Sequence, residues 1–368
     1  MKKVFCLIIL VSSLSSLSCK SKVEKKSLNV SPVVIEDNNL VFQVDPKSEL
    51  LMMALRLAKV NAMSYTSGFD YVFTNDRLVE KYKDHPLIKQ LSKATKKYNG
   101  DFSSELEIAK YISDDITTLN VDSKNLPLEL QAFWSQVNLN QFIDNLNDFA
   151  VKIQFERIWK MNEGKNRIGL TNLKEFYQKN DYKILSWVEN TFFTKEYSCK
   201  FTINSSFYVR NYFFPLSARF SGKNVLLDLY HPMDLNIEGF DDGWTSLYWG
   251  ESIIQTILME NWEVIEGKIK PYVDEVLKKN KISVKNFNKE KYIQEIRYFL
   301  SLILLTDYVK MAKTEEDIQG FQNYLKQKIL LENVEEIILD HESSYLNNRD
   351  QYPEYKDFII EYLKQFKI

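Results

Sequence analysis

The spacing of apolar residues is the feature that most constrains the fold of this chain. Along most of its 368 residues, apolar side chains recur every three or four positions, which is typical of amphipathic helices. The pattern changes in the middle third, where Lys200–Asn204 alternates polar and apolar residues, Ser206–Arg210 does so more weakly, and Val225–Tyr230 is rich in strand formers. We therefore predict a predominantly α-helical α+β fold with a small, mainly antiparallel sheet. The expected parts are helices at 45–195, the sheet at 198–231 and helices at 246–366.

Capping signals predict where several helices begin. Asp45 followed by Pro46 is an N-cap acid with proline at the first helical position, so a helix is expected at about 47–62. Val41–Val44, just before it, can form a short strand. Pro86 is expected to end one helix and begin another, with His85 in a capping or buried hydrogen-bonding role at the junction. Further helices are expected at about 75–98, 103–113, 127–152, 155–162 and 171–194.

The N-terminus carries the features of an export signal. Two lysines at positions 2 and 3 precede the apolar stretch Val4–Val11, which is too short to span a bilayer, and small residues then lead to Cys19. This order resembles a bacterial lipoprotein signal, and an ordinary secretory signal is the alternative. The resemblance implies that residues 1–18 are removed and that Cys19 carries acyl chains such as palmitate. Residues 19–40 would then be a flexible tether that holds the body in the bacterial cell envelope.

Composition excludes several classes of function. The chain has 48 Lys+Arg and 50 Asp+Glu, a net charge of −2, which argues against nucleic-acid binding. No segment after the signal approaches the apolar run of about 20 residues that spans a bilayer, so the expected membrane attachment is through lipid. Only 3 His and 3 Cys are present. After processing, Cys199 would be the one remaining thiol, so we expect no intrachain disulfide.

Four short strings resemble, in order and spacing, the landmarks of one bacterial protein family. They are Val44–Leu51 (VDPKSELL), Tyr82–Pro86 (YKDHP), Leu185–Trp187 (LSW) and Asn348–Pro353 (NRDQYP). The family is a domain of unknown function, found in secreted proteins and lipoproteins and regarded as a group of gluzincin-like zinc metallopeptidases. The resemblance implies a single large domain at 41–368 with a metallopeptidase-like (zincin-like) core.

The same resemblance implies a His-Glu-x-x-His motif, in which two His bind Zn²⁺ from one helix face and the Glu activates the metal-bound water. The corresponding segment is Trp249–Gln255, and it contains no His. Gly250 and Ile254 stand at the two ligand positions, and only Glu251, at the general-base position, keeps its residue type. Since neither Gly nor Ile can bind a metal, we expect no zinc, no other cofactor and no catalysis. Glu251 is then an ordinary acid near a helix N-terminus.

Other residues near this segment are weaker candidates for a site. His231 is expected in a loop after a strand and is the best remaining His for an acid/base or ligand role, although a structural role is the more common one. Residues that can line a remaining cleft are Asp241, Asp242, Trp244 and Trp249. The family's third zinc ligand, a Glu, would align with Ile293 or, two residues later, with Glu295.

These patterns lead to one functional expectation with two alternatives. We expect a lipid-anchored envelope protein whose degenerate, inactive metallopeptidase-like domain binds a peptide, a glycan or a protein partner. One alternative is an active hydrolase with an altered site around Glu251 and His231. The other is a scaffold or adhesin without a functional cleft.

Overall fold

The structure, a computed structural model, describes part of the chain, from residue 25 through the central sheet, and a few later residues. The described residues are 25–58, 70–96, 103–121, 124, 126–179, 186–187, 198–208, 214–221, 224–233, 254, 267, 348 and 351–352. The predicted signal peptide lies outside them. So do nearly all of the helices predicted at 246–366.

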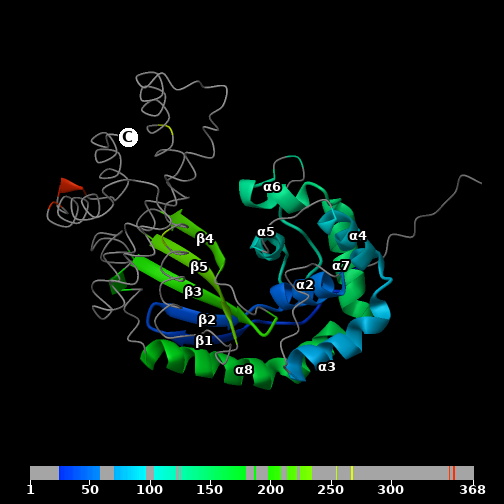
Figure 1. Cartoon of the computed structure of the whole chain (residues 1–368), viewed down its shortest axis with the longest axis horizontal. Helices are drawn as coiled ribbons and strands as arrows, with labels where there is room; N and C mark the ends of the chain where they lie inside the picture. The colour runs from blue at the N-terminus through cyan, green and yellow to red at the C-terminus, as the bar shows by residue number, and fades with distance from the viewer. Residues whose placement is uncertain are drawn as a thin grey trace, which may run out of the picture.

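Five strands form one mixed sheet in the order β1-β2-β3-β5-β4 (Figure 1). Their bounds are Val33–Asp37 (β1), Leu40–Val44 (β2), Ser198–Ser206 (β3), Phe214–Ser221 (β4) and Asn224–Pro232 (β5). The pairs β1–β2 and β4–β5 are antiparallel, whereas β2–β3 and β3–β5 are parallel. The prediction of a mainly antiparallel sheet is therefore wrong. Two pairings account for this: the N-terminal hairpin adds to β3 in parallel and places Leu40 opposite Phe201, and β3 and β5 are themselves parallel.

The segment before the first helix belongs to the body of the protein. The prediction of a flexible tether at 19–40 is therefore wrong from residue 25 onward: Leu28 and Val30 are buried, and β1 follows at Val33. The physical reason is the β-branched run Val33–Ile35, which has a high strand propensity although polar residues surround it. This run pairs with the apolar strand β2, and the cross-strand contacts stabilise the hairpin.

The central strands were predicted in part. β3 and β5 confirm the strands expected around 200–204 and 225–230, and both are longer than expected. The weaker strand expected at Ser206–Arg210 is contradicted, because β3 ends at Ser206 and a turn follows. The Ser206 hydroxyl accepts a hydrogen bond from the Tyr208 backbone N–H at 3.0 Å, which takes that donor away from strand pairing.

Seven α-helices are described. Their bounds are Pro46–Leu57 (α2), Asp70–Val79 (α3), Pro86–Thr95 (α4), Ser103–Glu107 (α5), Leu128–Trp134 (α6), Leu139–Lys152 (α7) and Phe155–Lys179 (α8). α2, α4 and α7 pack together, α8 packs along β1 and β2, and α5 lies against β4 (Figure 1). Short 3₁₀ turns at Glu80–Tyr82 and Ile108–Tyr111 follow α3 and α5.

Both predicted helix starts are confirmed. Asp45 caps α2, since its Oδ1 accepts from the backbone N–H of Lys47 at 3.1 Å. His85 caps α4, since its Nδ1 accepts from the backbone N–H of Leu87 at 3.2 Å. With Nδ1 acting as the acceptor, Nε2 carries the ring proton and donates to Asp148 Oδ2 at 2.9 Å. His85 is thus a buried structural residue of the helix junction.

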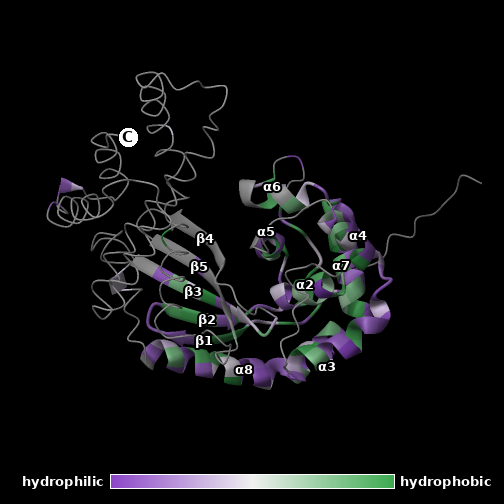
Figure 2. Ribbon diagram, viewed as in Figure 1, coloured by the Kyte–Doolittle hydropathy of each residue, from purple (hydrophilic) through white to green (hydrophobic). Residues whose placement is uncertain are grey.

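α8 is one continuous helix of 25 residues, where the sequence predicted two shorter ones at 155–162 and 171–194. The prediction failed because the stretch between them, Glu163–Leu170, contains two glycines and few apolar residues. Purple and green segments alternate along α8, which shows its mixed character (Figure 2). Near its C-terminal end the Tyr177 ring packs 5.4 Å from that of Phe42 on β2, which fixes the helix to the sheet.

Candidate functional site

The carboxyl ends of the three parallel strands meet at one edge of the sheet. β2, β3 and β5 run in the same direction, so the segments that follow Val44, Ser206 and Pro232 emerge side by side. In parallel sheets this edge is where ligand and catalytic sites usually form. Here it is covered by the first turn of α2 and by α3 and α8, which bring polar side chains to the strand ends.

Glu49, in the first turn of α2, lies at the centre of these polar side chains. It is only 1% exposed, and its Oε2 accepts a hydrogen bond from the Tyr71 hydroxyl of α3 at 2.8 Å. The Ser206 hydroxyl at the end of β3 lies close enough to this carboxyl to lower its pKa. Burial nevertheless raises the pKa of Glu49 to about 7, although Ser206 and Tyr71 both act in the opposite direction.

Two tyrosines and three asparagines complete what we call the Glu49 cluster. Its members are Glu49, Tyr71, Asn75, Asn162, Asn166, Ser206 and Tyr208, and all are buried. The Tyr71 and Tyr208 rings meet edge-on with centroids 5.8 Å apart, and Asn162 Nδ2 donates to Asn75 Oδ1 at 3.0 Å. Burial, together with the nearby Glu49 carboxyl, raises the pKa of both tyrosines, so both remain neutral phenols at physiological pH.

Several polar atoms of the cluster have no hydrogen-bond partner of ordinary distance and angle. They are Glu49 Oε1, Asn75 Nδ2, both amide atoms of Asn166 and the Tyr208 hydroxyl. Asn166 lies close enough to the Tyr71 hydroxyl to lower the pKa of Tyr71 somewhat. Asn75 has the same effect on the pKa of Tyr208. Each buried polar group left in this state costs about 1–3 kcal/mol. Among the described residues the cluster is therefore the strongest candidate for a role beyond stability.

Close packing of α8 against the strand ends determines the shape of this region. A Cβ atom on Gly169 would lie 2.5 Å from Met233 Sδ and 3.1 Å from Phe207 Cζ. Met233 directly follows β5, and its sulfur also lies 3.6 Å from the Ser205 hydroxyl. A side chain at this position would therefore have to displace Met233. The same face of α8 carries Asn162, which donates to Asn75, and Asn166, which lies near the Tyr71 hydroxyl.

The chemistry available to the cluster is the exchange of one proton between Glu49 and solvent. Glu49 can gain or lose this proton near neutral pH, with Tyr71 as its hydrogen-bonding partner. Because Glu49 is almost completely buried, this exchange changes the charge of the core and does not act on a substrate in contact with solvent.

Two of the residues that the sequence predicted for a site lie within the described residues. His231 is not in a loop, as predicted, but within β5, where its backbone pairs with Ser205 on β3. Ile254 is helical and 0% exposed. The other candidates lie outside the described residues. They are Cys19, Asp241, Asp242, Trp244, Trp249, Gly250, Glu251, Ile293 and Glu295.

The Glu49 cluster was not predicted from the sequence. One available signal was Glu49 itself, an acid directly before the apolar run Leu50–Leu55 of α2. A second was the spacing of Asn162, Asn166 and Gly169, which places polar and small residues on the same face of α8 as the buried Leu173. Both signals describe one helix at a time, and neither says which other elements complete the cluster.

The residues at the expected zinc position do not fit zinc. Gly250 offers no side chain, and the Ile254 side chain is an apolar group buried in the core. Among the described residues, no group of three or more His, Cys, Asp or Glu side chains converges closely enough to hold a metal ion. In that part of the chain no helix has the length and apolar character needed to cross a membrane.

We compared the chain with protein-family models, with curated proteins and with solved structures, and none of the three comparisons found a match.

Proposed function

We propose that this protein is a lipid-anchored protein of the bacterial envelope whose metallopeptidase-like domain binds a peptide, glycan or protein partner without hydrolysing it. The observation that carries the proposal is the environment of Ile254. This residue stands where the resemblance calls for the second zinc-binding His, and it is 0% exposed. A fully buried aliphatic side chain serves packing, so this helix position contributes to a core and not to a metal site.

The loss of both zinc ligands removes the chemistry that the remaining acid would need. In a gluzincin the Glu acts on a water molecule whose pKa the metal has lowered. Glu251 alone has neither that activated water nor a Lewis acid to polarise a peptide carbonyl. Binding of a peptide, glycan or protein does not require the metal. Binding without hydrolysis is therefore the proposed role.

The anchor can be tested by removing the lipidated cysteine. The Cys19→Ala variant should lose acyl labelling and leave the membrane fraction for the soluble envelope fraction. Cys6→Ser is the matched control, because it also removes a cysteine from the signal region but should leave both properties unchanged. Unchanged acyl labelling and unchanged membrane fractionation of the Cys19→Ala variant would contradict the anchor.

The absence of catalysis can be tested on the purified mature domain. We expect far less than one equivalent of zinc by elemental analysis, and peptides or glycan chains that bind should be recovered with intact covalent structure by mass spectrometry. Near-stoichiometric zinc that is lost in Glu251→Gln would overturn the proposal. Metal-free hydrolysis that is lost in both Glu251→Gln and His231→Ala would instead favour the alternative of an altered active site.

A further inference from the structure

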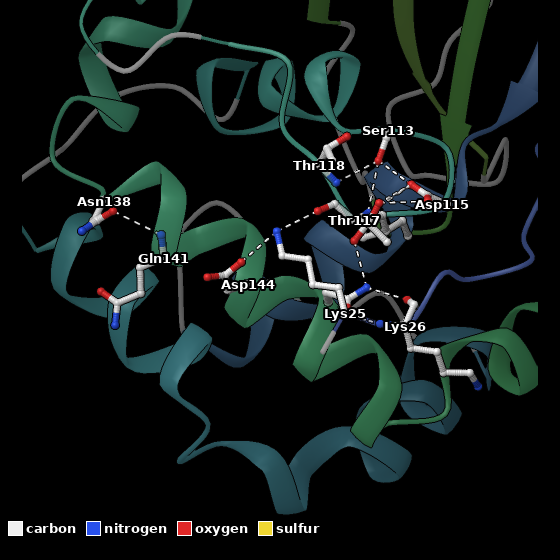
Figure 3. A network of polar contacts seen from close by, with 11 residues as sticks. Lys25, Lys26, Ser113, Asp115, Thr117, Thr118, Asn138, Gln141 and Asp144 are labelled. Carbon is white, nitrogen blue, oxygen red and sulfur yellow. Dashed lines mark hydrogen bonds and ion pairs between the residues drawn. The ribbon is translucent and has the colours of Figure 1, made fainter. Parts of the chain in front are cut away.

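Residues 25–31, which we call the N-terminal clamp, are bound to the helical part of the molecule. The Lys25 ammonium donates to the Thr117 carbonyl at 2.8 Å and forms an ion pair with Asp144 at 2.8 Å (Figure 3). The turn that presents Thr117 is itself held by Asp115, whose carboxylate accepts from the hydroxyls of Ser113 and Thr117 at 2.6–2.8 Å. The clamp therefore binds to a well-ordered surface.

The Asn147 side chain on α7 hydrogen-bonds to both backbone polar groups of Lys26 in the clamp. Its Oδ1 accepts from the Lys26 N–H at 3.0 Å, and its Nδ2 donates to the Lys26 carbonyl at 2.8 Å. The same amide group also donates to the Ile116 carbonyl at 3.0 Å, so it joins the clamp to the adjacent turn. A buried side chain that satisfies both backbone groups of one residue fixes the position of that residue closely.

The rest of the clamp docks on the N-terminal end of α8. Leu28 is buried, and its N–H donates to the Asp115 carbonyl at 3.1 Å. The Asn29 N–H donates to Glu156 at 2.6 Å, and the Trp159 indole donates to the Ser31 carbonyl at 3.1 Å. From Lys25 to Ser31, the path of the chain is thus fixed against α7, the turn at Thr117 and the start of α8.

Chain length then limits how far this end can be from an anchoring lipid. Six residue steps separate Cys19 from Lys25, and a fully extended chain covers about 22 Å over that length. A domain of this size has a radius of gyration of about 20 Å, and so a diameter of roughly 50 Å. A connection of this length cannot pass around the body, so the clamped end must stay near the bilayer.

α8 supplies an internal measure of distance from the clamp. Its 25 residues span about 37 Å. Glu156, near the start of α8, binds the clamp, whereas Gln178, near its end, donates to Asp37 at the far end of β1 at 2.9 Å. The two ends of this helix are therefore well separated, and the clamp binds at the first of them.

We propose that the N-terminal clamp sets the orientation of the domain on the membrane, so that the end carrying Thr117, Asp144 and Glu156 faces the lipid surface. This proposal rests on the proposed lipid anchor at Cys19. The partner is a phospholipid bilayer, held against this end by the short connection and not by an apolar patch. The end at Gln178 and Asp37 is then the one available to a partner in the envelope.

The proposal can be tested with two fluorescent labels on the acylated protein in phospholipid vesicles. Both labels are placed in a Cys199→Ser background, which removes the natural thiol. Thr118→Cys places one label beside the clamp. Glu175→Cys places the other near the end of α8, about 29 Å along the helix from Glu156. Both positions are exposed, and neither side chain makes a described contact. A quencher on the lipid headgroups should quench the Thr118 label several-fold more strongly than the Glu175 label.

A longer connection provides the control that leaves the fold untouched. Inserting about 20 Gly/Ser residues between Lys22 and Val23 adds about 25 Å of flexible reach, and the ratio of the two quenching efficiencies should fall toward one. Equal quenching of both labels in the acylated protein with its natural connection would overturn the proposed orientation. Failure of the protein to acquire lipid or bind vesicles would instead overturn the anchor itself, so the two failures can be told apart.

Discussion

At the scale of single residues, the most informative group is the buried carboxyl of Glu49. Its pKa is raised by burial from 4.5 to about 7, while in the unfolded chain it returns to the ordinary value. Between these two values the unfolded chain releases the proton and the folded protein keeps it. The free energy of unfolding must therefore fall as the pH rises through this window, by about 3 kcal/mol from this one group.

We predict that Glu49→Gln removes this pH dependence. Glutamine has the same shape and keeps an acceptor for Tyr71 but cannot ionise. Asp45, the one other acid that acts on this carboxyl, stays in place. Urea unfolding at about pH 5 and about pH 8 should show a clearly smaller loss of stability in the variant than in the natural protein. Exposed Glu175→Gln is the control, and an equal pH slope in Glu49→Gln and the natural protein would contradict the assignment.

Gly169 supports a second prediction at this scale, with Gly164 on the same helix as its control. Alanine normally stabilises a helix by up to about 1 kcal/mol relative to glycine. At Gly164 nothing lies within 4 Å of an added Cβ, so Gly164→Ala should stabilise the protein. At Gly169 the added atom would meet buried Met233, and overpacking costs of about 1–3 kcal/mol should outweigh the gain.

The two variants should therefore shift the thermal unfolding midpoint in opposite directions. Similar stabilisation in both would mean that Met233 moves aside at little cost. In that case the close approach of α8 to the strand ends would not depend on glycine.

At the scale of secondary-structure elements, strong local signals gave correct predictions, whereas weak or irregular ones did not. The Asp45-Pro46 cap, the break at Pro86 and the strand runs of β2 and β5 follow from neighbouring residues, and the structure has them where the sequence placed them. β4 escaped prediction because it contains Pro215 and a register shift beside it. Such irregularities hide the alternation on which strand prediction relies.

Pairing between distant segments explains the larger errors at this scale. The parallel pairing of β2 with β3 joins segments on either side of the helical region, and no local pattern encodes it. The same is true of the Glu49 cluster, which needs residues from α2, α3, α8 and the end of β3. Each polar residue could be placed on its own helix or strand from the sequence. The contacts between these elements, which bury the residue, could not be predicted.

The α2 cap gives a prediction about a whole element. Asp45→Ala removes the side-chain acceptor for the Lys47 N–H and for the Ser48 hydroxyl, so it should cost about 1 kcal/mol of stability. Asp45→Asn keeps a capping oxygen and should cost clearly less. Chemical unfolding of both variants provides the comparison. Equal losses would show that the carboxylate charge, and not the cap, is what matters for α2.

At the scale of the whole molecule, β2 links the N-terminal hairpin to the central sheet and to the helical layer. Phe42, in the middle of β2, lies opposite Ile35 on β1 and Ile203 on β3. Its ring is completely buried and packs against Tyr177 of α8. A single side chain thus contacts parts of the chain that are far apart in the sequence, so its loss should be felt throughout the body.

We predict that Phe42→Ala lowers the free energy of unfolding by about 3–5 kcal/mol, the usual cost of removing a buried aromatic ring. Because the sheet and α8 share this contact, the loss should appear as one cooperative transition. Circular dichroism of the helices and hydrogen exchange of the amides of β2 and β3 should then report the same loss of stability. Val34→Ala, on the partly exposed edge strand β1, is the control and should cost far less. If the strand amides exchanged faster while the helical signal did not shift, the sheet and the helical layer would unfold as separate units, and β2 would not be the link between them.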